Sequence, residues 1–290
     1  MPTISRLDIS LLDSFLLDDT TASPPAPSIS DAYQFINAAG TAIGLQNANI
    51  VTATILYSGP KRDLSRAAYP RADGEYMQAD YWRENKIVLT GTIKDTTRDL
   101  LEARIDQLRT FFNASPGTLM LTFAGAQRYF DNVYADIETM LDKRIGSYIT
   151  FTPFTLTFYC AQPFGRDANR TYFAASTPLT ATPTVYDIYN GGSAKTFGLW
   201  TFTINTAGTF TGLTLYNTTT GEAIVISGTF VNGDTLVIDA EQKIVTQNGT
   251  EIDYTGIFPS ITVGQNSVTA EPVGAGYSIA VNEEHYNRYL

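Results

Sequence analysis

The stretch that decides the fold is "GTFVNGDTLVIDAEQKIVTQNGTEIDYTG", Gly228–Gly256. It holds two Asn-Gly pairs, Asn232-Gly233 and Asn248-Gly249, each flanked by short runs rich in β-branched residues. A two-residue type I′ turn needs a positive φ at both central residues, and Asn and Gly adopt that conformation most readily. Each pair therefore predicts a tight hairpin turn between two antiparallel strands.

The residues around these pairs alternate in polarity as strands do. Leu236 and Ile238 are expected on one face of a strand and Val237 on the other. A polar turn at residues 240–243 leads into the next strand, and residues 251–254 continue the alternation. The whole stretch is predicted to be an antiparallel β-meander.

Four acidic residues lie in this stretch, and they raise the question of a calcium site. A calcium-binding loop places its carboxylates at alternate positions around a glycine. The acids here do not follow that spacing, so we interpret them as solvated turn residues. They are Asp234, Asp239, Glu241 and Asp253.

The composition of the chain changes along its length. The 290 residues are enough for two domains, and 43% of them are hydrophobic. Residues 1–165 carry 18 acids and 14 bases, whereas residues 171–290 carry 10 acids, 3 bases and 22 threonines. Alternation stops in "AQPFGRDANRTYF", Ala161–Phe173. We therefore expect one domain over residues 1–165 and a second, all-β domain over residues 166–290.

One segment of the first part has the period of a helix. "KDTTRDLLEARIDQLRTFFN", residues 94–113, is predicted to start at Thr96 or Thr97 as the cap, with Asp99 in its first turn. Asn113 and the Pro-Gly pair at 116–117 are expected to end it. Its apolar stripe consists of Leu101, Ile105, Leu108 and Phe112.

The rest of the chain is predicted to be mostly β. Residues 22–30 form a Pro/Ser loop, and residues 59–85 are expected to be a long polar loop at a functional site or an interface. Strands of the first part are expected at residues 4–18, 48–58, 86–93, 117–123, 129–140 and 147–160. The second part is expected to open with strands at 186–205 and a hairpin at 212–227.

The sequence argues against most enzyme classes. His285 is the only histidine and Cys160 the only cysteine, and chain ends are often mobile, so neither a Ser-His-Asp site nor zinc is expected. No phosphate-binding glycine motif occurs. We predict no catalytic, cofactor-binding or metal-binding residue and no enzyme activity. A hydrolase that uses a carboxylate pair remains the alternative, because the chain has 29 acids.

The order of these parts resembles the distal tail proteins of long-tailed bacteriophages (siphoviruses), over roughly residue 50 to residue 290. The resemblance rests on a strand–helix–strand unit at residues 87–121 and on further residues that follow a linker beginning "CAQPFG". The residues after the linker are "NGG" at Asn190–Gly192, the G-D-x-L-x-I-D run Gly233–Asp239 with the strand and turn Val245–Gly249, which are the most specific, and Gly264 with Asn266.

The resemblance implies a fold and a function. The N-terminal domain would be a tail-tube-like β-sandwich or barrel with one packed helix, and the C-terminal domain a galectin-like or carbohydrate-binding-module-like β-sandwich. Six copies would form a ring at the virion tail tip, between the tail tube protein and the tail hub or baseplate. Tape-measure protein and DNA would pass through the ring, and some relatives dock receptor-binding proteins or tail fibres. No catalysis, cofactor or membrane is implied.

Two further expectations concern surfaces. The net charge of −10 disfavours a nucleic-acid-coating surface and suits a channel that DNA crosses without sticking. The alternative function is a carbohydrate-binding module for host recognition, in which exposed aromatic rings stack on sugars; the competing interpretation places most of these rings in the core or at an interface. The candidate rings are Tyr186, Tyr189, Trp200, Tyr216 and Tyr254.

Overall fold

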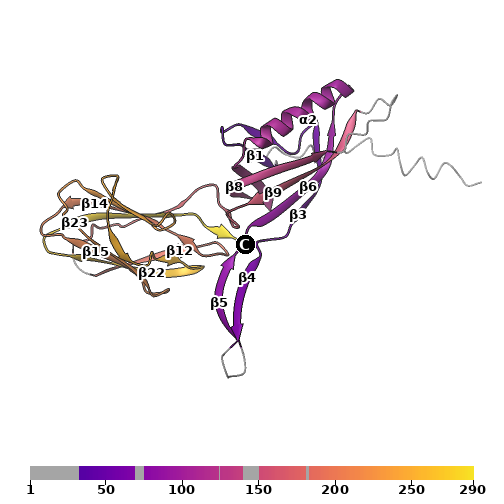
Figure 1. The fold of residues 1–290 in the computed structure, drawn as a ribbon. Helices are drawn as coiled ribbons and strands as arrows, with labels where there is room; N and C mark the ends of the chain where they lie inside the picture. The colour runs from indigo at the N-terminus through magenta and orange to yellow at the C-terminus, as the bar shows by residue number, and fades with distance from the viewer. Residues whose placement is uncertain (1–32, 69–74, 124, 140–149, 181–182) are drawn as a thin grey trace, which may run out of the picture.

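The structure is a computed structural model that describes residues 33–68, 75–123, 125–139, 150–180 and 183–290, with the side chains of residues 65–80 left out of the description. The predicted strands at 4–18 and the Pro/Ser segment at 22–30 lie outside the described residues. Two β-rich units lie side by side, and a hairpin points away from both (Figure 1). The mostly β fold class is confirmed.

The N-terminal unit is built on one antiparallel sheet of nine strands. Its main path is made of β1 (Gln34–Ile36), β2 (Ala42–Gly44), β3 (Ile50–Tyr57), β6 (Asn85–Lys94), β7 (Gly117–Phe123), β8 (Ala126–Thr139) and β9 (Phe151–Cys160). The spatial order is β2-β1-β7-β8-β9-β6-β3, so β3 is an edge strand. The strands predicted at 48–58, 86–93, 117–123 and 129–140 correspond to β3, β6, β7 and β8.

Helix α2 (Arg98–Asn113) lies across one face of this sheet (Figure 1). Thr97 is its N-cap and accepts a 3.3 Å hydrogen bond from the backbone N–H of Leu100. The predicted apolar stripe faces the sheet and is buried, as expected from its period of 3.6 residues. Phe112 packs near Phe158 of β9, with ring centroids 6.3 Å apart. The buried helix residues are Leu101, Ile105, Leu108 and Phe112.

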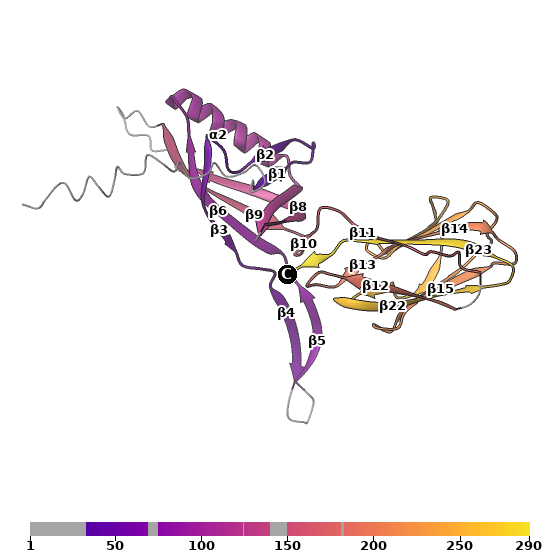
Figure 2. The same cartoon turned by 180° about the vertical axis from the view of Figure 1, so that it is seen from behind.

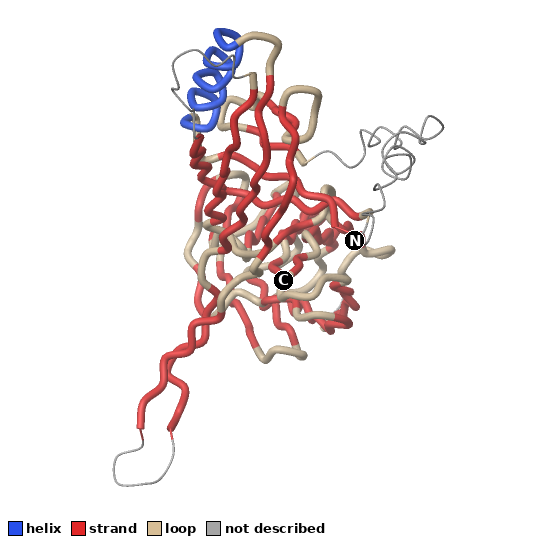
Figure 3. The backbone as a smooth tube through the Cα atoms, turned by 90° about the vertical axis from the view of Figure 1, so that its right-hand side faces the viewer, coloured by secondary structure: helices blue, strands red, loops and turns tan. Residues whose placement is uncertain are grey.

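The predicted long loop at 59–85 is wrong, because most of it forms a β-hairpin. Strands β4 (Arg62–Ala68) and β5 (Glu75–Trp82) pair antiparallel from Arg62↔Trp82 to Ala68↔Glu75. They form a two-stranded sheet of their own and extend away from the body of the molecule (Figure 3). The segment is rich in charged and polar residues, a composition that favours a loop over strands.

The C-terminal unit is a sandwich of two larger antiparallel sheets with a shared core. The first contains β11 (Thr171–Ala174), β14 (Leu199–Thr206), β17 (Thr235–Asp239), β18 (Ile244–Gln247), β19 (Thr250–Glu251) and β23 (Ser278–His285). The second contains β12 (Thr184–Asn190), β15 (Gly212–Asn217), β16 (Glu222–Ser227), β20 (Tyr254–Gly256) and β22 (Gly264–Val273). A small third sheet pairs β13 (Thr196–Phe197) with β21 (Ser260–Ile261).

The two Asn-Gly pairs have different outcomes. Asn248-Gly249 has φ of 52° and 79° and joins β18 to β19, as a type I′ hairpin turn requires. Asn232-Gly233 does not close a hairpin: β16 belongs to the five-stranded sheet and β17 to the six-stranded one. The chain crosses from the five-stranded sheet to the six-stranded sheet at this pair. It crosses back between β19 and β20. The predicted continuous meander is therefore wrong, although Leu236 and Ile238 are buried on one face as expected.

The chain returns to the N-terminal sheet after the sandwich. Strand β24 (Arg288–Tyr289) pairs with β10 (Gly165–Arg166), and Arg166 in turn pairs with Tyr129 of β8. In the view from behind, β10 lies beside the end of the chain, between the two units (Figure 2). The boundary between residues 165 and 166 stays a prediction.

Candidate functional surfaces

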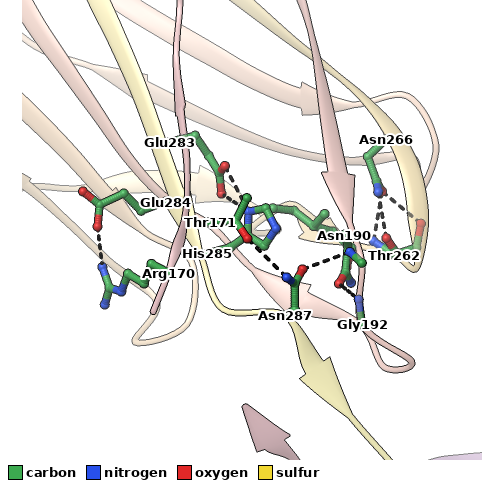
Figure 4. A network of polar contacts seen from close by, with 12 residues as sticks. Arg170, Thr171, Asn190, Gly192, Thr262, Asn266, Glu283, Glu284, His285 and Asn287 are labelled. Carbon is green, nitrogen blue, oxygen red and sulfur yellow. Dashed lines mark hydrogen bonds and ion pairs between the residues drawn. The ribbon is translucent and has the colours of Figure 1, made fainter. Parts of the chain in front are cut away.

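The single histidine is part of a buried polar pair. His285 is in β23 and 2% exposed, and its Nδ1 lies 3.1 Å from each carboxylate oxygen of Glu283 (Figure 4). The expectation of a mobile chain end is wrong for this residue, because His285 is the buried last residue of β23 and pairs with Thr171 of β11. Burial raises the pKa of Glu283 above its ordinary value, and the hydrogen bond from His285 opposes that effect.

The other candidate reactive groups have structural surroundings. Cys160 is fully buried, and this desolvation raises the pKa of its thiol to about 12. Within the described ranges, no three His, Cys, Asp or Glu side chains are grouped so as to hold a metal ion. Likewise, no described helix is long and apolar enough to cross a membrane. The expected lack of catalytic, cofactor-binding and metal-binding residues stays a prediction.

One of the four meander acids differs from the expected solvated residue. Asp234 is 6% exposed, and its carboxylate accepts hydrogen bonds from Asn248 Nδ2 and Gln247 Nε2, each at 2.8 Å, and from the N–H of Val231 at 2.9 Å. These donors, the Asn248 amide first, lower the pKa of Asp234. Asp234 therefore ties the sheet-crossing turn to the neighbouring hairpin turn, a long-range contact that the local sequence does not reveal.

The base of the projecting hairpin is fixed on the N-terminal unit. The Trp82 ring contacts the Phe164 ring edge-on, with centroids 6.0 Å apart, and the Arg62 guanidinium lies 5.8 Å from the Trp82 centroid. Asp63 pairs with Arg83, which lowers the pKa of the Asp63 carboxyl. These contacts set the direction in which the hairpin leaves the body.

The sheet face opposite α2 is exposed to solvent. Cross-strand register places Tyr134, Tyr159 and Lys86 in one row across β8, β9 and β6. The Lys86 ammonium lies 5.5 Å from the Tyr159 ring centroid. The exposed fractions of the large apolar side chains are 64% for Leu56, 61% for Phe151, 51% for Tyr134 and 37% for Tyr159.

The five aromatic candidates for sugar stacking differ in their surroundings. Tyr186 and Trp200 are 5% and 1% exposed, with ring centroids 6.4 Å apart in the sandwich core, so their assignment as sugar platforms is wrong. Tyr254 packs edge-on against Phe258. Tyr189 and Tyr216 lie on the outer face of the five-stranded sheet and are 63% and 37% exposed.

Two further features of the structure could not be predicted from the sequence. One is the β4–β5 hairpin, because the charged and polar composition of residues 59–85 favours a loop. The contacts of residues 286–290 with the N-terminal unit were also missed. The sequence pattern nearest to these contacts is the "NGG" at Asn190–Gly192, because this loop contacts Asn287 and Arg288.

Comparison with known proteins places these surfaces in a family context. Residues 191–285 match the model of the siphovirus-type tail component, C-terminal domain. No curated protein sequence matches the chain at a significant level. Among solved structures, the Dit (gp 19.1) protein of phage SPP1, described as a paradigm of the hub adsorption apparatus in phages that infect Gram-positive bacteria, matches with a TM-score of 0.64 at 14% identity, over 89% of this chain and 99% of that chain.

A weaker match carries no weight for the fold. A chain of the phage p2 baseplate in its activated conformation with strontium gives a TM-score of 0.44 at 12% identity, over 87% of this chain and 97% of that chain. The resemblance to siphovirus distal tail proteins is nevertheless confirmed: residues 191–285 match the tail component family by sequence, and 89% of the chain matches the SPP1 distal tail protein by fold.

Proposed function

We propose that this chain is a structural subunit of a phage tail tip that assembles into a closed, hexameric ring. In this role the ring joins the tail tube protein to the hub or baseplate and leaves a channel for tape-measure protein and DNA. The observation that carries the proposal is the β4–β5 hairpin, which extends beyond its own unit (Figure 3). The family match supports the tail location.

The hairpin needs a partner surface for a physical reason. An isolated two-stranded hairpin is marginally stable in water, because it buries too little apolar surface to offset the ordering of its backbone. The base of this hairpin is fixed by Trp82 and Phe164, while its strands pair with no third strand of the same chain among the described residues. A neighbouring copy in a ring supplies the missing surface, since a ring uses a head-to-tail interface that closes by rotation.

The exposed face and edge of the N-terminal sheet support the same proposal. Among the described residues, no strand pairs with the outer edge of β3, and exposed edges favour pairing with another chain unless something covers them. The face opposite α2 carries Lys86 and Lys94 on β6 and Asp136 and Glu138 on β8. These charges balance, so the net charge of −10 is not concentrated on this face.

The ring is tested on the full chain. We would replace residues 65–80 with a short Gly/Ser turn and measure particle mass by light scattering and shape by electron-microscopy class averages. The parent chain is expected to form rings, and the shortened variant monomers. A matched aromatic pair refines the test: Trp82→Ala is expected to weaken assembly, and Tyr172→Ala, at an exposed ring of the C-terminal unit, to leave it intact.

Two results would contradict this proposal. One is a parent chain that stays monomeric at every concentration and is absent from assembled virions. The other is a ring that forms equally well without residues 65–80, which would assign closure to another surface. Turnover of a cell-wall polymer by the purified chain would favour the carboxylate-pair hydrolase instead.

Sugar binding is a second candidate function, favoured by the shared outer face of Tyr189 and Tyr216. Asp187 and Ser267 pair with each other on the same sheet and supply polar groups between the two rings. A glycan array with the full chain, compared with a Tyr189→Ala/Tyr216→Ala variant, tests this candidate. Binding that is lost in the variant supports it, and no binding at millimolar sugar rejects it.

A further inference from the structure

Residues 286–290, here named the closing segment, lie between the two units and pair with both. On one edge, β24 pairs with β10, with Gly165 opposite Tyr289 and Arg166 opposite Arg288. On the other edge, the carbonyl of Arg288 accepts hydrogen bonds from the N–H groups of Ser193 and Ala194, at 2.8 and 3.0 Å. The closing segment thus forms a continuous β connection from the N-terminal sheet to the sandwich.

Asp167 is the centre of the polar contacts at this junction. Its Oδ1 accepts a 2.6 Å bond from Nη1 of Arg128 on β8. Its Oδ2 accepts bonds from Asn287 Nδ2 at 3.1 Å and from the Tyr289 hydroxyl at 3.2 Å. The Arg128 guanidinium also lies 3.5 Å from the Tyr289 ring centroid. One carboxylate therefore joins the N-terminal sheet to two side chains of the closing segment.

Two more arginines hold the start of the segment. The guanidinium of Arg166 lies 4.4 Å from the Tyr286 ring centroid and that of Arg170 lies 5.1 Å from it, so the ring is held by both cations. Arg166 is itself paired with Asp131 of β8, and Arg170 with Glu284 at 3.2 Å (Figure 4). These pairs fix both cations in place.

The sandwich provides a shaped surface for the other edge. The buried Asn190 donates to the carbonyl of Ala194 at 2.9 Å and accepts from the N–H of Gly192, which holds the 191–194 loop in place (Figure 4). Asn287 Oδ1 accepts from the N–H of Gly191 at 2.9 Å. A Cβ on Gly192 would lie 2.2 Å from the carbonyl oxygen of Arg288, so only glycine allows this approach.

From this geometry we propose that the closing segment is a clasp that locks the C-terminal unit onto the N-terminal sheet in one orientation. Residues 161–170 give the covalent connection at the junction. Strand β24 makes a second, non-covalent connection, which prevents the C-terminal unit from rotating relative to the N-terminal sheet. A force or rotation applied to the sandwich then reaches β8 through Asp167 and Arg128. Opening the clasp frees the sandwich to swing while both cores stay folded.

The test measures the distance between the two units in the isolated chain. Spin labels are attached to cysteines introduced at Asp106 on α2 and Val231 on the sandwich, both exposed, while Cys160 is buried and stays unlabelled. The parent chain is expected to give a single narrow distance distribution. Asp167→Ala and Gly192→Val, which attack the clasp from its two sides, are each expected to lose that single peak.

Matched controls separate the clasp from general damage. Asp63→Ala removes a carboxylate paired with Arg83 outside the junction. Gly44→Val adds a side chain at a position where the nearest atom to the new Cβ is 3.9 Å away. Both controls are expected to keep the narrow distribution, and Asp167→Asn to show a smaller change than Asp167→Ala. If both clasp variants keep circular dichroism and the narrow peak of the parent, the proposal is overturned. Broadening in the controls to the same extent would overturn it as well.

Discussion

The two units bury their apolar side chains in different ways. The C-terminal unit faces two sheets toward each other, so Trp200, Phe202 and their neighbours are covered from both sides. The N-terminal unit covers one face of its sheet with α2 and leaves large apolar side chains exposed on the other, and its β4–β5 hairpin extends away from the sheet (Figure 3). The comparison teaches that the C-terminal unit covers its apolar residues by itself, whereas the N-terminal unit leaves large apolar side chains on one sheet face in contact with solvent.

The largest expected effect is in the closed sandwich. Trp200→Ala removes a ring that is 1% exposed and should destabilise the C-terminal unit by about 4 kcal/mol. Denaturant unfolding followed by circular dichroism measures this loss. Trp82→Ala, at a ring that is 36% exposed, is the matched control and should change the unfolding free energy of the monomer by less than about 1 kcal/mol. Equal losses of unfolding free energy in the two variants would contradict the difference in burial between the two units.

The next effect tests the covered face of the N-terminal sheet. Leu108→Ala in α2 removes a side chain that is 3% exposed and should cost about 3 kcal/mol of unfolding free energy. Leu100→Ala, on the same helix but 51% exposed, should stay within about 0.5 kcal/mol of the parent. Thermal unfolding of both variants measures the difference. Similar losses at the two positions would mean that the sheet does not cover one face of the helix.

A smaller effect is expected at the turn that crosses between sheets. Asp234→Ala leaves the donors of Asn248, Gln247 and Val231 without their acceptor and should destabilise the sandwich by about 2 kcal/mol. The exposed Asp253 is the control, and its replacement by Ala should have an effect within about 0.5 kcal/mol.

The pH dependence at Asp234 follows from its lowered pKa. Below the unfolded value of 3.8, the unfolded chain binds a proton more readily than the folded chain, so folding stability increases with pH. The contribution of Asp234 is present above that value and is lost as the pH falls through the folded pKa. Unfolding curves of parent and Asp234→Ala should therefore converge at low pH. A gap that stays constant down to the folded pKa would count against the hydrogen-bonded carboxylate.

The smallest expected effect concerns Glu283 in the same closed core. Its raised pKa means that the folded chain binds a proton more readily than the unfolded chain, so its contribution to stability is largest below the unfolded value of 4.5 and is lost as the pH rises through the folded pKa. Glu283→Gln removes this slope. The stability of the variant relative to the parent should therefore increase from pH 4.5 upward, as measured by urea unfolding at several pH values; a difference that is flat with pH is the contrary result.

Local sequence patterns were sufficient to predict the helix and strands whose buried residues recur with a regular period. The stripe of α2 and the strands β3, β6, β7 and β8 could be predicted because each presents an apolar face to one core. The family resemblance could be predicted from the run around Gly233–Asp239. Neither depends on knowing which strands are neighbours.

The sheet membership of the strands, the buried face of each strand and the contacts at the junction depend on residues that are far apart in the sequence. Asn232-Gly233 has the same local signal as Asn248-Gly249, but tertiary pairing sends its flanking strands to different sheets. Tyr186 and Tyr189 lie three residues apart on one strand, so their opposite faces follow only from the strand's register. Asp167 and Asn287 are 120 positions apart, and no local pattern relates them.

The adjacency of β10 and β24 has an evolutionary consequence. The chain leaves the N-terminal sheet after Arg166 and comes back to it at Arg288, so the sandwich is an insert between two paired strands, and its own first and last strands, β11 and β23, also lie next to each other. Modules whose two ends meet can be exchanged with little disturbance to their host. A different module could therefore take the place of the sandwich between β10 and β24 while the N-terminal sheet keeps its fold.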